Sequence, residues 1–355
     1  MSSTGDNVMS SQLLVDMPAQ SAARLLTLSL LEQLPQNASA LASADPRDVS
    51  RYAAMYRSVV RRLRACLSIY ADALGNGVPR KARRRLRTLS DAAERLYRAD
   101  VQLVWCARHA PSPGHVETVG VLGDGARASI WLCDRVGRRR ERAVRLMQRM
   151  QSDSRPLRRI AKRLGVYTTA VRLDGVTSQQ SFARLTGDQL IATADTLGVA
   201  IRAVHADGSE AVLRSALRST ERLTYLLDPL RAYADVEEPS ERLHQLRALL
   251  ERLNRSAIVG RAIVRGGRRV AAAQAGEQLY IAIWPTPDGP APVSVGANGH
   301  PHIELADLQR GLLVLAEALH DEVARALDEL EATWQPPAVE RLTSDIAAIA
   351  GRLRS

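Results

Sequence analysis

Basic residues are concentrated in about one third of the chain, where they recur at helical spacing. Residues 51–165 carry 27 Arg or Lys residues against nine Asp or Glu residues, whereas the whole 355-residue chain has a formal net charge of +11. The segment 56–70 shows the pattern most clearly, because at 100° per residue Arg57, Arg61 and Arg64 share one narrow face. Apolar residues of this stretch and of the turn after it fall on the opposite face: Tyr56, Val60, Leu63, Leu67 and Leu74. The pattern predicts a helix that packs one face into a core and displays guanidinium groups on the other.

The overall composition favours a helical fold. Aromatic residues make up only 4% of the chain, with a single Phe, and Leu and Ala dominate the 46% of residues that are hydrophobic. Only Lys81 and Lys162 are lysines, so almost all of the positive charge comes from arginine. Two interpretations of this bias stay open: the base composition of the genome, or selection for a planar fork that binds phosphate bidentately.

Helical periodicity predicts the same order of helices in each half of the chain. We expect an all-α fold of two four-helix bundles related by an internal repeat. The predicted boundaries are a disordered tail at 1–16, a first, strongly basic bundle over 17–165, a linker at 166–183 and a second bundle over 184–355. The predicted helices are 17–35, 51–74, 79–108, 127–152 and 155–164, then 186–205, 209–233, 238–265, 303–334 and 337–354. The apolar runs 278–284 and 293–295 bracket a Pro/Gly-rich turn and predict either a small β-hairpin near 278–296 or a loop.

Fourteen basic residues on these helices are candidates for binding an anion. They are Arg57, Arg61, Arg62, Arg64, Arg80, Lys81, Arg83, Arg84, Arg87, Arg138, Arg145, Arg214, Arg218 and Arg222. Between residues 51 and 100 the only acidic residues are Asp72, Asp91, Glu94 and Asp100. The shortage of acids predicts that the row at Arg57, Arg61 and Arg64 is accessible and shares a concave surface with Arg83, Arg84 or Arg87.

The alternative is that these arginines belong to solvated helix faces paired with nearby acids. For the run Arg138–Arg149, we expect Glu141 to be the one local acid available as a partner. Glu210 and Glu221 lie beside the second row, so we expect Arg214, Arg218 and Arg222 to bind an anion less tightly than the first row does.

The sequence contains no pattern of residues that predicts a catalytic, cofactor or metal site. Gly120–Gly125 is glycine-rich but lacks the Gly-Lys-Ser/Thr ending of a phosphate-binding loop, and His300 and His302 are the only closely spaced histidines. Cys66, Cys106 and Cys133 show no metal-binding spacing and are expected to be free buried thiols in a reducing cytoplasm. We also expect no signal peptide and no membrane-spanning segment.

The arginine helix resembles the signature helix of the CHAD family, the conserved-histidine α-helical domain. The residues that carry the resemblance are Arg57-x-x-x-Arg61-Arg62-Leu63-Arg64-x-x-Leu67. Weaker similarities to the family occur at Arg98–Val101, Arg222–Asp228 and Leu250–Asn254. This chain departs from the family pattern, because the positions that histidine occupies in the family fall here at Ala53 or Ala54 and at or near Arg214. Thr224 and Glu221 also stand where the family has basic residues.

The resemblance implies helices only, two bundles with internal pseudo-symmetry, and binding of inorganic polyphosphate without catalysis. We therefore predict a non-enzymatic polyanion-binding protein of the cytoplasm, and its association with polyphosphate granules stays open. The alternatives are a nucleic-acid-associated protein and a protein that docks on granules or an acidic partner through the same surface. Few aromatic residues lie among the arginines, which argues against single-strand binding. Oligomeric state and the preferred polyphosphate length stay open.

Overall fold

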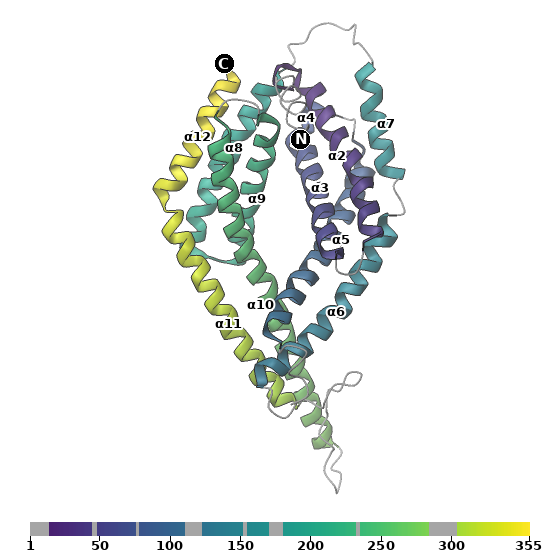
Figure 1. The fold of residues 1–355 in the computed structure, drawn as a ribbon, viewed down its shortest axis with the longest axis vertical. Coiled ribbons are helices and arrows are strands. Elements are labelled where there is room, and N and C mark those ends of the chain that lie inside the picture. Colours follow the sequence, from purple (N-terminus) through teal and green to yellow (C-terminus); the bar gives the residue numbers. More distant parts are fainter. Residues whose placement is uncertain are drawn as a thin grey trace. The chain divides into compact units, whose positions relative to one another are not determined.

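The computed structural model describes residues 14–44, 48–75, 78–110, 123–151, 155–169, 180–231, 235–283 and 304–355, and it places helices but no β-strands there (Figure 1). The helices of the first half are α2 (Ala19–Ala42), α3 (Val49–Ile69), α4 (Ala71–Leu74), α5 (Arg80–His109), α6 (Asp124–Gln151) and α7 (Arg155–Thr169). Those of the second half are α8 (Phe182–Asp207), α9 (Glu210–Leu227), the 3₁₀-helix η3 (Asp228–Leu230), α10 (Glu237–Ile283), α11 (Leu305–Thr333) and α12 (Pro336–Arg354). The predicted all-α class is confirmed.

The two halves repeat the same order of elements, as predicted. The helices α2, α3, α5, α6 and α7 correspond in order to α8, α9, α10, α11 and α12, and a short helical turn, α4 or η3, follows the second helix of each half. The chain segments that enter the first helix of each half also meet directly. Pro18 and Ser181 form an isolated antiparallel bridge, in which the N–H of Ala19 donates to the carbonyl of Gln180 at 3.1 Å and the N–H of Phe182 donates to that of Met17 at 2.9 Å.

The chain forms two compact units, and each unit takes residues from both halves. Unit 1 comprises Met1–Tyr97, Arg145–Asn254 and Asp328–Ser355, and unit 2 comprises Arg98–Val144 and Arg255–Leu327. The helices α5, α6, α10 and α11 therefore contribute residues to both units. The predicted division into 17–165 and 184–355 follows the sequence repeat and stays a prediction.

The core of unit 1 contains the apolar face of α3. The apolar residues predicted for that face are buried, namely Tyr56, Val60, Leu63 and Leu67, as is Leu74, which the structure places in α4. In the second half, α8 packs closely against α12, where a Cβ added to Gly187 would lie 2.9 Å from the carbonyl oxygen of Ala350. The helix α8 begins at a side-chain cap, since the hydroxyl of Ser181 accepts from the N–H of Arg184, and it ends at Gly208 with φ +60°.

The core of unit 2 lies between parts of α5, α6, α10 and α11. It includes Trp105 and Cys106 from α5, Trp131 and Val136 from α6, and residues of the other two helices. The helices α6 and α11 approach so closely that a Cβ on Gly311 would lie 2.0 Å from the carbonyl oxygen of Asp124. Only glycine fits at this crossing.

The prediction of a β-strand at the start of segment 278–296 is wrong. Residues 278–283 are the last residues of α10, which runs for 47 residues from Glu237. A short apolar run has no periodicity that distinguishes a strand from a helix, and here the alanine-rich sequence before it continues the helix. Residues 284–303, with the second half of the predicted hairpin, lie outside the described residues.

Two other predicted segments fall largely outside the described residues. These are residues 1–13 of the predicted tail and residues 170–179 of the predicted linker, whose first residues instead extend α7 to Thr169. The three cysteines are free, although Cys133 is only partly buried.

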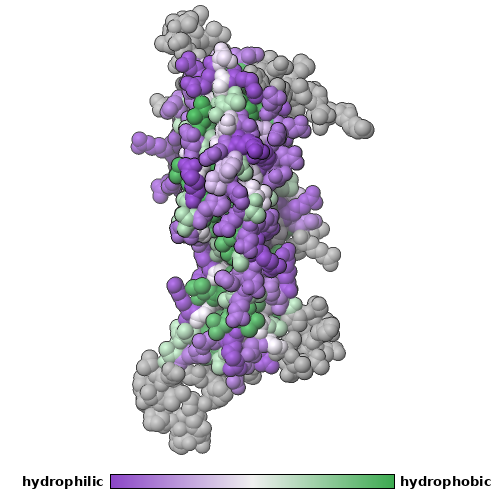
Figure 2. Space-filling model, turned by 90° about the vertical axis from the view of Figure 1, so that its left-hand side faces the viewer, coloured by the Kyte–Doolittle hydropathy of each residue, from purple (hydrophilic) through white to green (hydrophobic). Residues whose placement is uncertain are grey.

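Hydrophilic side chains dominate the face shown in Figure 2, with hydrophobic side chains in small groups between them. Among the described residues, no helix has both the length and the apolar character needed to cross a bilayer.

Candidate polyanion-binding groove

Arginine side chains converge on a groove in unit 1 between the end of α3, α4 and the beginning of α5. The groove has a volume of about 450 Å³. Its lining residues are Arg64, Leu67, Ser68, Ala71, Arg80, Arg83, Arg84, Leu86 and Arg87. Five of these nine are arginines, and none is acidic or aromatic. The structure thus brings Arg64 together with four of the basic residues predicted at the start of the next helix.

The local sequence explains why the arginines of α5 point outward. The helix starts directly after Val78 and Pro79, where the N–H groups of Ala82 and Arg83 bond to the carbonyl of Pro79. Ala82, Leu86 and Leu89 are buried, whereas Arg83, Arg84 and Arg87 between them are exposed. Basic residues oppose the macrodipole at a helix start, but they and the helix N-terminus together make this end strongly positive.

One arginine of the groove is held in place while the others lack acidic partners. The Nη1 of Arg64 donates to the hydroxyl of Ser90 at 2.8 Å. Burial lowers the pKa of Arg64, and the charges of Arg87 and Arg61 lower it further against the effect of Asp91. Among the described residues, no ion pair joins the other four groove arginines to an acid: Arg80, Arg83, Arg84 and Arg87. The candidate Lys81 is also exposed on α5 but is not among the lining residues.

The prediction that Arg57 is freely accessible is wrong. Its side chain is 13% exposed, and its Nε donates to Glu94 at 2.8 Å. Its guanidinium also lies over the ring of Tyr97, 3.7 Å from the centroid. Burial by itself would lower the pKa of Arg57, but Glu94 and Tyr97 outweigh that effect and raise it. Glu94 lies one helix away, so helical spacing alone did not reveal this pair.

Arg61 likewise contacts a carboxylate instead of solvent. Its side chain is 22% exposed, and its Nη2 donates to Oε2 of Glu221, a residue of α9 that is 4% exposed. Burial raises the pKa of Glu221, and Arg61 is the largest influence that opposes the rise. The sequence carried a signal for a buried carboxylate, although not for the identity of its partner: Glu221 follows Leu217 by one helical turn on the apolar side of its helix. A carboxylate at such a position needs a partner.

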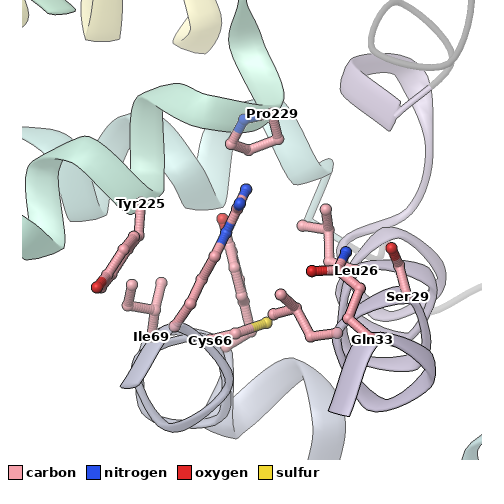
Figure 3. Close-up of a pocket in the computed structure, with 10 residues that line it drawn as sticks. Leu26, Ser29, Gln33, Cys66, Ile69, Tyr225 and Pro229 are labelled. Carbon is pink, nitrogen blue, oxygen red and sulfur yellow. The ribbon is translucent and has the colours of Figure 1, made fainter. Parts of the chain in front are cut away.

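Arg62 is directed to a different, smaller pocket. Its Nη2 lies 2.9 Å from Oδ2 of Asp228 at the start of η3. The pocket holds about 70 Å³, which is room for a few water molecules. Figure 3 shows its lining residues, which include Leu26, Ser29 and Gln33 from α2, Cys66 and Ile69 from α3, and Tyr225 and Pro229 from the second half. Such a space is too small for a phosphate chain.

Two of the three arginines of the second predicted row contact other side chains. The Nε of Arg214 lies 3.5 Å from a carboxylate oxygen of Glu210, and Arg222 donates to Oε1 of Gln189 at 2.7 Å. Of these three arginines, only Arg218 is exposed. Glu221, predicted to compete for this row, is instead the partner of Arg61.

The two remaining candidates lie on α6, in different units. Arg138 belongs to unit 2 and pairs with Asp134 at 2.5 Å, so the prediction that Glu141 is the one local acid for the run Arg138–Arg149 is wrong. The spacing from Asp134 to Arg138 is one helical turn, which makes this pair recognisable in the sequence. Arg145 is exposed in unit 1.

Comparisons with known proteins bear on the fold. No family model and no curated protein matches the chain. Among solved structures, it is similar to the crystal structure of the CHAD domain from the plant Ricinus communis, with a TM-score of 0.52 and 15% identity. The match covers 94% of this chain and 93% of that one. The chain therefore has a CHAD-like fold, as the resemblance of its arginine helix predicted.

Proposed function

We propose that this protein binds inorganic polyphosphate in the groove between α3, α4 and α5, and that it acts by binding and not by catalysis. The observation that carries the proposal is the acid-free lining, in which Arg64, Arg80, Arg83, Arg84 and Arg87 face one volume of about 450 Å³. Like charges gathered without carboxylates repel one another unless an anion lies among them. The CHAD-like fold supports the proposal, since the resemblance implies the same ligand.

The proposed mechanism is electrostatic and bidentate. Each guanidinium can donate two parallel hydrogen bonds to the oxygens of one phosphate unit. Arg64 is already oriented by Ser90, so its binding geometry requires little additional ordering. Binding releases counterions condensed on the polyanion, and the affinity should therefore fall steeply with salt.

The lining favours polyphosphate over single-stranded nucleic acid. Proteins that bind single strands without sequence preference combine basic grooves with aromatic side chains on which bases stack. The lining residues of this groove include no aromatic side chain. The groove offers guanidinium contacts to phosphate and no aromatic surface on which a base could stack.

A competition experiment with two matched variants tests the proposal. R83Q/R84Q removes two groove charges, whereas R202Q/R341Q removes two charges from exposed arginines of α8 and α12 in the same unit. We expect R83Q/R84Q to bind long-chain polyphosphate about tenfold or more weakly, since a hydrogen bond to a charged group contributes about 1.5–3 kcal/mol. The control should change affinity by less than about twofold, because distant surface charges are screened at 0.15 M salt.

The same titrations with single-stranded DNA and RNA as competitors decide the ligand class. Polyphosphate should displace either nucleic acid at an equal concentration of phosphate. Equal losses in the two variants would show that the groove is not the site, and preferential binding of RNA or DNA would overturn the choice of ligand.

A further inference from the structure

Unit 2 contains a second cluster of arginines that does not belong to the groove. Two of them, Arg135 and Arg139, are one turn apart on α6, and two others, Arg265 and Arg269, are one turn apart on α10. The two helices pack closely here, because a Cβ on Gly266 would lie 3.2 Å from the ring of Trp131. Packing of α10 on α6 therefore brings the two pairs of guanidiniums close enough for their charges to repel one another.

The nearby acids are already engaged elsewhere. Asp134 lies 2.5 Å from Arg138, and Asp100 lies 2.6 Å from Arg140. In the part of the chain that the structure describes, no ion pair joins Arg139, Arg265 or Arg269 to an acid. The cluster thus differs from the paired arginines of α3.

Electrostatics within the cluster is unfavourable without a counter-ion. Burial lowers the pKa of Arg139, and the charges of Arg265, Arg269 and Arg135 lower it further. Burial also lowers the pKa of Arg265, and the charge of Arg269 lowers it further. Each of these shifts has the direction expected for cations that repel one another.

Two buried donors at the cluster lack an acceptor. Trp131 is 7% exposed, and its indole Nε1 has no hydrogen-bond partner. The Nε of Arg135 is also buried without a partner, and the guanidinium of this residue lies 4.4 Å from the centre of the Trp131 ring. Buried donors are normally satisfied by protein, by ordered water or by a ligand, so both can bond to an acceptor from outside the chain.

We propose that Arg135, Arg139, Arg265 and Arg269 form a second anion-binding site, which takes a compact anion with several negative charges such as a short oligophosphate. One helical turn separates the arginines of each pair, so the cluster extends about 6 Å along each helix. This dimension suits a few phosphate units and not an extended strand. The site is independent of the proposed function, because it uses other residues in the other unit.

Calorimetric titration of the full chain with sodium tripolyphosphate tests the site. The titration uses a background in which the groove is disabled by R80Q/R83Q/R84Q/R87Q. In that background R265Q/R269Q should lower the remaining affinity about tenfold or more. The matched control R255Q/R268Q removes the same charge from two exposed arginines of α10 in unit 2 and should change it less than about threefold. Equal effects of the two double variants, or no remaining tripolyphosphate binding before they are introduced, would overturn the proposal.

Thermal unfolding without and with tripolyphosphate separates a binding role from a merely structural one. Without anion, R265Q/R269Q should unfold at the same or a higher temperature than its parent, because the substitution removes repulsion. With anion, the parent should gain stability and R265Q/R269Q should gain less. A lower unfolding temperature in both conditions, with an unchanged gain on adding anion, would show that the two arginines serve packing alone.

Discussion

The arginines of α3 and those at the beginning of α5 have similar helical spacing but opposite environments. Arg57 and Arg61 contact Glu94 and Glu221, which other helices supply. Among the residues that the structure describes, no acid pairs with Arg80, Arg83, Arg84 or Arg87, which line a groove with Arg64. The difference shows that the spacing of arginines predicts which face they occupy, whereas neighbouring helices determine whether their charge is available to a ligand.

The two sets should therefore respond differently to substitution. Changes at Arg57 and Arg61 should act mainly on stability, and changes in the groove mainly on affinity. A triple variant of Arg57, Arg61 and Arg64 would mix the two effects, so single substitutions give the sharper test.

The largest effect is expected from R61A. The substitution leaves the buried carboxylate of Glu221 without its partner, and breaking a buried pair in this way costs about 3 kcal/mol. Urea unfolding measures the loss, and R61A/E221Q serves as the control because it also removes the stranded charge. A loss no greater in R61A than in the double variant would contradict the assignment of this pair.

The pH dependence of R61A sharpens the same comparison. The pKa of Glu221 is raised above its usual value in the folded protein, so the folded state binds the proton more tightly than the unfolded state. Its ionisation therefore lowers stability as pH rises above about 4.5 and through the folded pKa. Loss of Arg61 raises that pKa further, and the destabilisation by R61A should be smaller at pH 5 than at pH 8. Urea unfolding curves at the two pH values test whether the destabilisation by R61A increases with pH.

R57A should destabilise the protein by about 1–2 kcal/mol. The expected loss combines the partly exposed ion pair with Glu94 and the cation–π contact with Tyr97. Polyphosphate affinity, measured under conditions where the variant is folded, should stay within about twofold of the parent. A tenfold loss of affinity with unchanged stability would instead place Arg57 in the binding site.

The salt dependence of binding should distinguish groove arginines from those of α9. By analogy with single-stranded nucleic acid, each lost phosphate contact flattens the slope of log affinity against log salt by about 0.7. R83Q/R84Q should therefore flatten the slope by about 1.4, and R214Q/R218Q by much less, since Arg214 is near Glu210. Equal slopes for the two variants would show that the second row binds as strongly as the groove.

The smallest effect is expected from S90A. This change removes the hydroxyl that accepts from Arg64 and leaves all charges in place. Affinity for polyphosphate should fall less than about threefold, without a change in the salt slope, because the number of phosphate contacts stays the same. A steeper loss than in R83Q/R84Q would show that the orientation of Arg64 dominates binding.

The sequence alone determined the helical class, the repeated order of helices and the buried face of α3. Each follows from local periodicity, which places residues three or four apart on one side of a helix. The same periodicity did not distinguish the short run at 278–283 from a strand, because six residues are too few to establish a period.

The tertiary structure decided which arginines are available. Arg61 and Glu221 are 160 residues apart, and no local pattern brings them together. The cluster of Arg139 with Arg265 likewise depends on the packing of α6 against α10. Charge pairing acts through space over a few ångströms, so the identity of an arginine's partner is a property of the packed helices and not of the spacing within one of them.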